Sequence, residues 1–274
     1  MTILNLDINR LTGHIPFGLA NLTQLTILTL GSNHLTGPIP FGLANLTKLT
    51  ILILGFSQLT GKIPFELTNM IRLTILSLCF NRLSSPIPFE LASLTQLNIL
   101  KLGSNKLIGP IPFGLVNLTQ LNILVLNNSR LIVSIPFGLM NLKKIYLLDI
   151  SGNYLSGNVS ICNTSLHILD VSNNSFGGSL TQCLHNVFKG SELRAIRLSE
   201  NKLQGLLPRS LVNCMMLEAI DVINNQFNDT FPSWLGNLPH LKVLLLRFNK
   251  FHCQMFENSE TNCEFPNMQI LDLS

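Results

Sequence analysis

The sequence predicts an α/β solenoid, a stack of similar turns that each contribute one short strand, and three observations lead to this prediction. Segments 15–22 and 39–46 both read IPFGLANL, and segment 111–118 reads IPFGLVNL. A leucine-x-leucine pair recurs every 24 residues in the first half of the chain. Five residues after the first leucine of the pair, most turns have an asparagine. A fixed period in the twenties with these offsets is typical of a parallel-strand solenoid.

We expect one array over residues 1–274, with about eleven turns and part of a twelfth. Residues 1–147 hold near-identical 24-residue repeats, and residues 148–274 hold diverged repeats with spacings of 21 and 27 residues as well as 24. The first position of the pair marks each turn: Leu4, Leu28, Leu52, Leu76, Leu100, Leu124, Leu148, Leu169, Ile196, Ile220, Leu244 and Leu271.

Each strand should alternate between the core and a concave sheet face. In the second turn, Leu28 and Leu30 are predicted to point inward and Thr29 outward. The asparagine column can satisfy backbone groups of the adjoining loops, because an amide both donates and accepts hydrogen bonds. Ser57 and Ser129 replace this asparagine, so we expect looser turns there.

A Gly-x-Ile-Pro segment follows in many turns and predicts a tight bend and then a short helical or 3-10 turn on the convex side. That turn begins with a phenylalanine. We interpret this aromatic column as packing into the convex side of the core, the usual role of aromatic stripes. The alternative is an aromatic ladder that binds a ligand. The column contains Phe17, Phe41, Phe65, Phe89, Phe113 and Phe137.

Composition fits a solenoid and argues against several functions. Hydrophobic residues make up 46% of the chain and charged residues 12%, as expected if every turn adds inward leucines to one continuous core. The net charge is +4 without a basic run, so no nucleic-acid partner is expected. No apolar run reaches the roughly 18 residues that cross a bilayer. The first residues do not read as a signal peptide.

The unit LxxLxxLxLxxNxLxGxIPxxLxxLxx resembles the plant-specific type of leucine-rich repeat. The stretch ICNTSLHILDVSNNSFGGSLTQCL from Ile161, segment 201–251 and the final NCEFPNMQILDLS resemble ectodomains of plant receptor-like proteins, including fungal- and Verticillium-wilt-resistance-like proteins. The resemblance implies a kinase-free ectodomain at the outer side of the plasma membrane, which binds an extracellular ligand and signals in defence through a partner receptor kinase. The family's signal peptide, cysteine cap and membrane helix have no counterpart here, so we expect a fragment that reaches the membrane only through missing parts of its parent.

The repeat register predicts one disulfide. Cys162 and Cys183 stand at the same offset in adjacent turns, near the separation that a disulfide needs. A second bridge between Cys253 and Cys263 rests only on their flanking one polar loop. Cys79 and Cys214 are expected to be unpaired. Alternatively, all six cysteines are small buried hydrophobic residues.

Eight Asn-x-Ser/Thr sequons, together with the expected disulfides, favour an extracellular parent protein. Asn21, Asn45 and Asn117 share one repeat column and are not independent evidence. The sequon asparagines are Asn21, Asn45, Asn117, Asn127, Asn158, Asn163, Asn173 and Asn228.

An enzyme is not expected. The histidines are dispersed without metal-ligand spacing, and neither a metal nor a cofactor is predicted. Asp149 and Asp170 form the best carboxylate pair, since they share an outward column and could share a proton. However, Leu-Asp-x-Ser is also a common variant of the plant strand, which is the interpretation we favour.

Binding is predicted on the concave face. The early turns place isoleucines there, which are either an apolar interaction strip or simply good strand formers. The late turns are polar and better able to discriminate partners. The candidate residues are Phe56, Phe80, Asp149, Asp170, Arg197, Glu200, Asp221, Asn224, Arg247 and Phe248. The expected partner is a protein, peptide or glycan ligand, with a co-receptor kinase. Three alternatives stay open: an inhibitor resembling polygalacturonase-inhibiting proteins, a receptor-kinase ectodomain, and a truncated gene copy.

Overall fold

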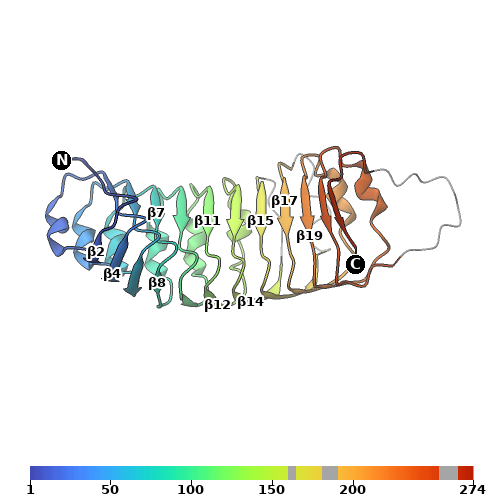
Figure 1. The fold of residues 1–274 in the computed structure, drawn as a ribbon, viewed down its shortest axis with the longest axis horizontal. Helices are drawn as coiled ribbons and strands as arrows, with labels where there is room; N and C mark the ends of the chain where they lie inside the picture. The colour runs from blue at the N-terminus through green and yellow to red at the C-terminus, as the bar shows by residue number, and fades with distance from the viewer. Residues whose placement is uncertain (160–164, 181–190, 253–264, 274) are drawn as a thin grey trace, which may run out of the picture. The chain divides into compact units, whose positions relative to one another are not determined.

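The computed structural model describes residues 1–159, 165–180, 191–252 and 265–273. The chain forms two compact units, which we call unit 1 (Met1–Ile145) and unit 2 (Tyr146–Ser274). In both units, short parallel strands stack side by side and are joined by 3-10 turns (Figure 1). This confirms the predicted α/β solenoid. Within the described ranges, no helix has the length and apolar character needed to span a bilayer.

Unit 1 is the regular half. Its main sheet consists of β1 (Ile3–Asn5), β3 (Ile27–Thr29), β5 (Ile51–Ile53), β7 (Ile75–Ser77), β9 (Ile99–Lys101) and β11 (Ile123–Val125). A second row of strands contains β2 (Thr12–His14), β4 (His34–Pro38), β6 (Gln58–Gly61), β8 (Arg82–Leu83), β10 (Ile108–Gly109) and β12 (Arg130–Val133). The 3-10 turns are η1 (Phe17–Asn21), η2 (Phe41–Asn45), η3 (Phe65–Asn69), η4 (Phe89–Ser93), η5 (Phe113–Asn117) and η6 (Leu139–Asn141).

Unit 2 repeats this plan with irregular spacing. Its main sheet consists of β13 (Leu147–Asp149), β15 (Ile168–Asp170), β17 (Ala195–Arg197), β19 (Ala219–Asp221), β21 (Val243–Leu245) and β22 (Ile270–Asp272). The second row contains β14 (Tyr154–Asn158), β16 (Ser175–Ser179), β18 (Lys202–Gly205) and β20 (Gln226–Phe227). The described 3-10 turns are η8 (Arg209–Asn213) and η9 (Ser233–Asn237).

The leucine pairs form the core as predicted. Leu28 pairs in register with Leu52, and both are fully buried. Thr29 points away from that core but is only 5% exposed, because the neighbouring turn covers it. Its hydroxyl donates to Asn5 Oδ1 at 2.9 Å. The outward side of the main sheet, here called the sheet face, is therefore more closely packed in unit 1 than the sequence suggested.

The asparagine column forms a buried ladder. Asn81 Oδ1 accepts from the Leu59 N–H at 3.0 Å, and Asn81 Nδ2 donates to the carbonyls of Leu54 and Leu78 at 2.9 and 3.1 Å. Because one amide satisfies backbone groups of successive turns, the ladder fastens each turn to its neighbour. The pattern recurs in unit 2, where Asn225 accepts from the Leu203 N–H at 3.0 Å.

The two serine substitutions leave unpaired hydroxyls. The Ser57 and Ser129 hydroxyls are buried, and neither has a hydrogen-bond partner in the described part of the chain. The residue before each serine has the left-handed φ of the other turns, 57° at Phe56 and 48° at Asn128. The backbone thus keeps its usual conformation there while a buried polar atom is unsatisfied, and looser turns stay a prediction.

The prediction that the phenylalanine column packs into the core is wrong. All six members, here called the Phe row (Phe17, Phe41, Phe65, Phe89, Phe113 and Phe137), are 48–84% exposed. The physical reason lies in the 3-10 turn. In η2 to η5 the third residue points inward, as fully buried Leu43 does, and the isoleucine before the turn, such as Ile39, fills the adjacent core. The phenylalanine that begins each turn is left on the outside.

Candidate ligand-binding face

Strand pairing in unit 2 aligns charged residues in one column of the sheet face. The last residues of successive strands are paired as Asp149 with Asp170, Asp170 with Arg197, and Arg197 with Asp221. These four residues therefore lie side by side in adjacent turns of the described structure, as their equal offsets in the repeat predict. Opposite charges alternate over Asp170, Arg197 and Asp221, whereas in unit 1 this column holds a single charged residue, Lys101.

The two adjacent aspartates are held by their own turns. Asp149 Oδ1 accepts from the Ser151 hydroxyl at 2.6 Å and from the Ser151 N–H at 3.1 Å. Asp170 Oδ1 makes the same pair of contacts with Ser172, at 2.6 and 3.0 Å. These bonds explain the Leu-Asp-x-Ser pattern as a way of ordering the bend after the strand.

The pKa of Asp149 lies above its usual value. Burial of the carboxylate is the largest cause and raises the pKa, whereas the hydrogen bonds from Ser151 lower it. The charge of Asp170 raises the pKa further and that of Arg197 lowers it. Asp170 itself is only 9% exposed and forms an ion pair with Arg197, with 3.4 Å between Oδ2 and Nη1.

Arg197 faces solvent, and the neighbouring Asp221 is half-buried. The Arg197 side chain is 56% exposed, so its guanidinium retains donors that can reach a partner. The Asp221 carboxylate accepts from the Ser199 hydroxyl at 2.7 Å and from the Ile223 N–H at 3.1 Å. Both side chains are thereby oriented by neighbouring turns before any ligand is bound.

A second column on the sheet face consists of residues in the left-handed backbone region. Glu200, Asn224 and Phe248 have φ values of 55°, 53° and 56° and are all exposed. The Asn224 side-chain amide donates to the Glu200 carboxylate. The Arg247 guanidinium lies 4.8 Å from the centroid of the Phe248 ring, and its Nε is 3.5 Å from Asp272 Oδ2. At that length the Arg247–Asp272 contact is an ion pair, while the buried Nε–H makes no aligned hydrogen bond in the described residues.

A third column flanks the same strands and was missed by the sequence reasoning. Glu218 accepts from Arg194 Nη1 at 3.0 Å and from Lys242 Nζ at 3.1 Å. The hydrogen bond from Lys242, then that from Arg194, lowers the pKa of Glu218. The signal was present in the sequence, because these three residues are spaced by 24 positions with alternating charge.

In unit 1 the exposed side chains of the candidate site are two aromatic rings. Phe56 and Phe80 stack with 4.3 Å between ring centroids and an interplanar angle of 15°. Both have positive φ and are about half exposed. A bulky residue in this backbone region is strained, so the arrangement is a candidate binding feature. The outward isoleucines, in contrast, are half-buried, which limits the apolar strip considered above.

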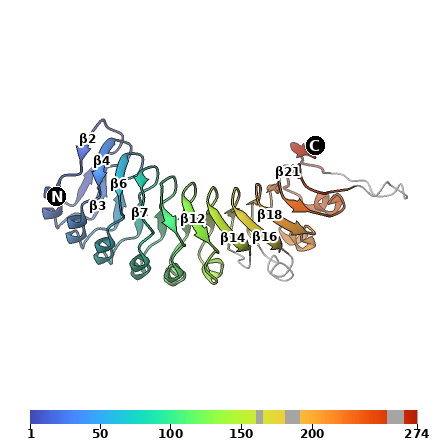
Figure 2. The same ribbon diagram turned by 90° about the horizontal axis from the view of Figure 1, so that it is seen from below.

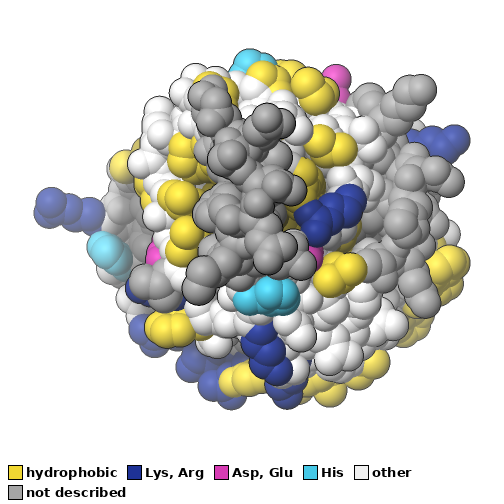
Figure 3. Space-filling view, turned by 90° about the vertical axis from the view of Figure 1, so that its right-hand side faces the viewer, with side chains coloured by type: hydrophobic (Ala, Val, Ile, Leu, Met, Phe, Trp, Pro, Cys, Tyr) yellow, Lys and Arg dark blue, Asp and Glu magenta, His cyan; other side chains and the backbone are white. Residues whose placement is uncertain are grey.

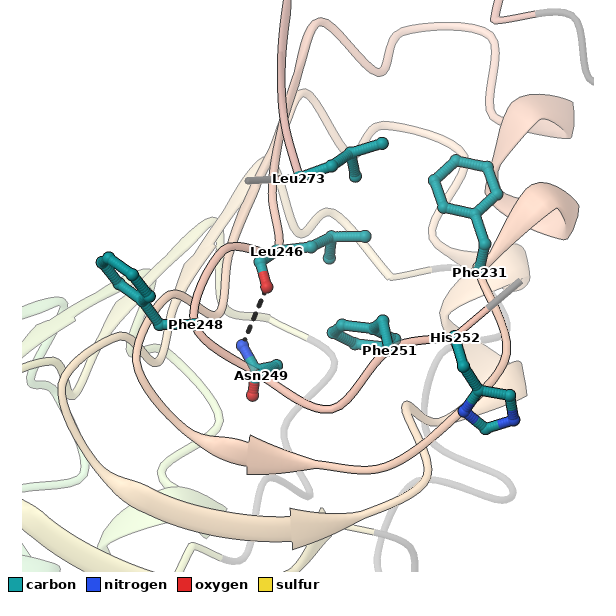
Figure 4. A pocket seen from close by; sticks show the side chains of 7 residues that line it. All are labelled: Phe231, Leu246, Phe248, Asn249, Phe251, His252 and Leu273. Atoms are coloured by element: carbon teal, nitrogen blue, oxygen red, sulfur yellow. Dashed lines mark hydrogen bonds between the residues drawn. The ribbon is translucent and has the colours of Figure 1, made fainter.

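A cavity of about 330 Å³ lies at the last described turns of unit 2. Leu246, Leu273, Phe231 and Phe251 extend toward it, and Phe248 points away from them (Figure 4). Asn249 Nδ2 donates to the Leu246 carbonyl at 3.0 Å, as a member of the asparagine ladder. Figure 3 shows hydrophobic and basic side chains together on the face turned toward the viewer. Since Leu246 and Asn249 belong to inward columns, the cavity continues the core, and the sheet face is the better candidate.

The cysteine and sequon predictions have separate outcomes. Cys79 and Cys214, which lie in described ranges, are both free and buried, as predicted. Burial raises the pKa of the Cys214 thiol to about 12. The predicted bridges, Cys162–Cys183 and Cys253–Cys263, lie outside the described residues, as does Asn163. Of the other sequon asparagines, Asn127 is half-buried and the following are exposed: Asn21, Asn45, Asn117, Asn158, Asn173 and Asn228.

Turns that each add a short strand to one parallel sheet, a buried asparagine ladder and an outward face that varies between turns define a leucine-rich-repeat solenoid. Residues 24–46, 72–94 and 165–187 match the family model described as Leucine Rich Repeat. Among curated relatives, Receptor-like protein 18 of Arabidopsis thaliana is 46% identical over 82 residues, which are 30% of this chain and 9% of that relative. The chain thus spans only a small part of the relative's length.

Solved structures agree with this class. One similar structure is the ectodomain of the Arabidopsis thaliana receptor kinase GASSHO1/SCHENGEN3 in complex with CASPARIAN STRIP INTEGRITY FACTOR 2. It matches this chain with a TM-score of 0.90 and 32% sequence identity, and the match covers 100% of this chain and 32% of the ectodomain. The Arabidopsis receptor kinase HAESA, in complex with the peptide hormone IDA and the co-receptor SERK1, has a TM-score of 0.85 and 31% identity, over 92% of this chain and 42% of that one. Both of these structural neighbours are ectodomains of plant receptor kinases.

Proposed function

We propose that this chain is part of the ectodomain of a plant receptor-like protein and binds an extracellular protein, peptide or glycan ligand on the sheet face of unit 2. The proposal rests on the three aligned columns of side chains on this face. Arg197, Glu200 and Phe248 are exposed there, and each contacts another side chain of the same face. Preoriented charged groups of this kind favour specific recognition, because mismatched partners leave them unpaired.

The comparisons support the same class of ligand. Two neighbours are ectodomains in complex with CASPARIAN STRIP INTEGRITY FACTOR 2 and with a peptide hormone, and the second complex includes a co-receptor. By analogy, we place the parent protein at the plasma membrane with these repeats outside the cell, and a partner receptor kinase in its signalling. We also propose that the parent protein acts in plant defence.

A receptor-kinase ectodomain is the second candidate, since GASSHO1/SCHENGEN3 and HAESA are both receptor kinases and each is more than 30% identical to this chain. The two candidates share the binding face and differ in the intracellular part of the parent protein. Sequencing the transcript that contains this reading frame separates them, because only a receptor kinase continues into a kinase domain.

A displayed library of random peptides tests the binding proposal. The full chain is used for selection, and the enriched peptides are then measured against Arg197→Ala, Asp221→Ala and Phe248→Ala variants. We expect each variant to weaken binding at least about tenfold, the usual effect at a residue central to an interface. Lys202→Ala is the matched control, because it removes an exposed charge from β18, outside the sheet face. Peptides that bind all four variants equally well would show that the sheet face of unit 2 is not the site.

A further inference from the structure

The Phe row is a second candidate interaction surface, separate from the sheet face. Each phenylalanine of the row begins one of the turns η1 to η5, except Phe137, which lies just before η6. The 3-10 turns of unit 1 lie along one edge of the stack, set apart from one another (Figure 2). The row therefore presents one large apolar side chain per turn over six consecutive turns, and each ring is 48–84% exposed.

The rings of the row stand apart and leave gaps. No ring contact joins any two of them within the described residues of unit 1, whereas Phe56 and Phe80 on the sheet face stack at 4.3 Å. The backbone between the rings is closely packed after the first turn. A side-chain carbon built on Gly18 would meet nothing within 4 Å, whereas one on Gly114 would lie 2.7 Å from the Ala92 side chain. Phe65 has a neighbour in its own chain, Lys62, whose Nζ lies 5.8 Å from the ring centroid. The rings therefore project from packed turns as separate apolar contacts.

The exposed area matches what a stable dimer needs. With about 200 Å² for a whole phenylalanine side chain, the exposed fractions of the row amount to roughly 800 Å² of apolar surface. A specific interface of ordinary size buries about 800 Å² on each partner. This area is the sum of six separate rings along one row, so a partner has to contact all six turns to cover it.

In the described part of unit 2, neither 3-10 turn begins with a phenylalanine. In unit 2 the residues that begin η8 and η9 are Arg209 and Ser233. Arg209 forms an ion pair with Asp229, with 3.1 Å between Nη2 and Oδ1. The same turn thus accepts a charged or a hydroxyl residue at this position, and the turn itself does not require phenylalanine.

We propose that the Phe row is the surface through which two copies of this chain associate. The spacing of its rings is set by the 24-residue repeat over six turns, and a second copy carries rings at the same spacing. Two rows related by a twofold axis place the rings of one copy against the row of the other, which gives a closed, self-complementary contact. Apolar burial drives the association, and the ligand face of unit 2 takes no part in it.

Sugars are the competing occupant of this surface. The sequon residues Asn21, Asn45 and Asn117 end the turns η1, η2 and η5, four positions after a phenylalanine of the row. A glycan on these asparagines could lie over the adjacent rings. The experiment therefore has to compare the chain with and without sugars.

Light scattering coupled to size-exclusion chromatography measures the mass of the full chain across a dilution series. We expect twice the monomer mass at the higher concentrations, and only monomer for a variant with Phe41→Ser, Phe89→Ser and Phe113→Ser. Circular dichroism and thermal unfolding of the variant should match the wild type, since the replaced rings are exposed. Tyr154→Ser, at an exposed aromatic residue of unit 2, is the control and should keep the doubled mass.

Three results would overturn the proposal. The first is a wild-type chain that stays monomeric at every concentration. The second is a doubled mass that survives in the triple serine variant with its fold intact. The third is a secreted chain that is monomeric while sugars occupy Asn21, Asn45 and Asn117, because the glycans and not a second copy would then cover the row. None of these results bears on peptide binding by unit 2.

Discussion

Units 1 and 2 have the same scaffold but present different outward surfaces. Both keep fully buried leucines and a hydrogen-bonded asparagine ladder, as Asn81 and Asn225 show. Unit 1 exposes phenylalanines on its 3-10 turns, whereas unit 2 exposes charged residues on its main sheet. The difference teaches that inward columns maintain the stack while outward columns are free to change, so function has to be sought in the columns that differ.

The largest expected effect on the free energy of unfolding comes from replacing a buried phenylalanine of unit 2, in comparison with an exposed one of unit 1. Phe227 in unit 2 is fully buried, and Phe227→Ala should lower the free energy of unfolding by about 3–5 kcal/mol. Phe41 in unit 1 is exposed, and Phe41→Ala should change it by less than about 0.5 kcal/mol. Urea unfolding of the two variants under conditions where the chain is monomeric measures both values. Similar losses in the two variants would contradict the distinction between the units.

The asparagine ladder should matter equally in both units. Asn81→Ala and Asn225→Ala each leave several buried backbone groups unpaired, and each should cost about 2–3 kcal/mol. Urea unfolding again provides the measurement, with Asn213→Ala, at an exposed asparagine that ends η8, as a control that should change little. A large loss in one unit and almost none in the other would mean that the scaffold is not shared.

The two serines of unit 1 allow a test in the stabilising direction. Ser57→Asn and Ser129→Asn restore the amide that the ladder carries elsewhere, and each should raise the free energy of unfolding by about 1 kcal/mol. The melting temperature should rise in both variants and further in the double variant. A melting temperature that does not change would mean that the unpaired serine hydroxyls cost nothing.

The smallest expected effect concerns charge on the sheet face of unit 2. Burial raises the pKa of Asp149 above its unfolded value, so the charged carboxylate is disfavoured in the folded state at neutral pH. Asp149→Asn keeps an oxygen for Ser151 and removes this penalty. The variant should therefore be slightly more stable than wild type at pH 7, and the difference should disappear as the pH falls below the raised pKa. Thermal unfolding as a function of pH measures this, and a variant that is less stable at pH 7 would contradict the assigned cause.

The repeat period predicted which residues share a column, and in most cases how the column is used. The leucine core, the ladder and the alignment of Asp149 with Asp170 all follow from equal offsets, because stacked turns place equal offsets side by side. The period alone does not tell which side of a 3-10 turn faces the core. For that reason the Phe row was predicted to be buried, although the third residue of the turn is the one that points inward.

The charge ladder of Arg194, Glu218 and Lys242 was missed for a different reason. These residues precede the strands, outside the positions that alternate in and out, and attention to the strand itself does not reach them. The spacing of 24 residues with alternating charge could have identified the ladder. The length of a side chain also matters, because lysine and arginine span between turns where shorter side chains cannot.

The central claim is that unit 2 binds ligand through its sheet face while unit 1 does not use its 3-10 turns for this purpose. Hydrogen–deuterium exchange of the full chain, with and without a library-selected peptide, tests it most directly. We expect slower exchange in β15, β17, β19 and β21 on peptide binding, and unchanged exchange in η1 to η5. Protection confined to η1 to η5, with no change in the strands of unit 2, would contradict it.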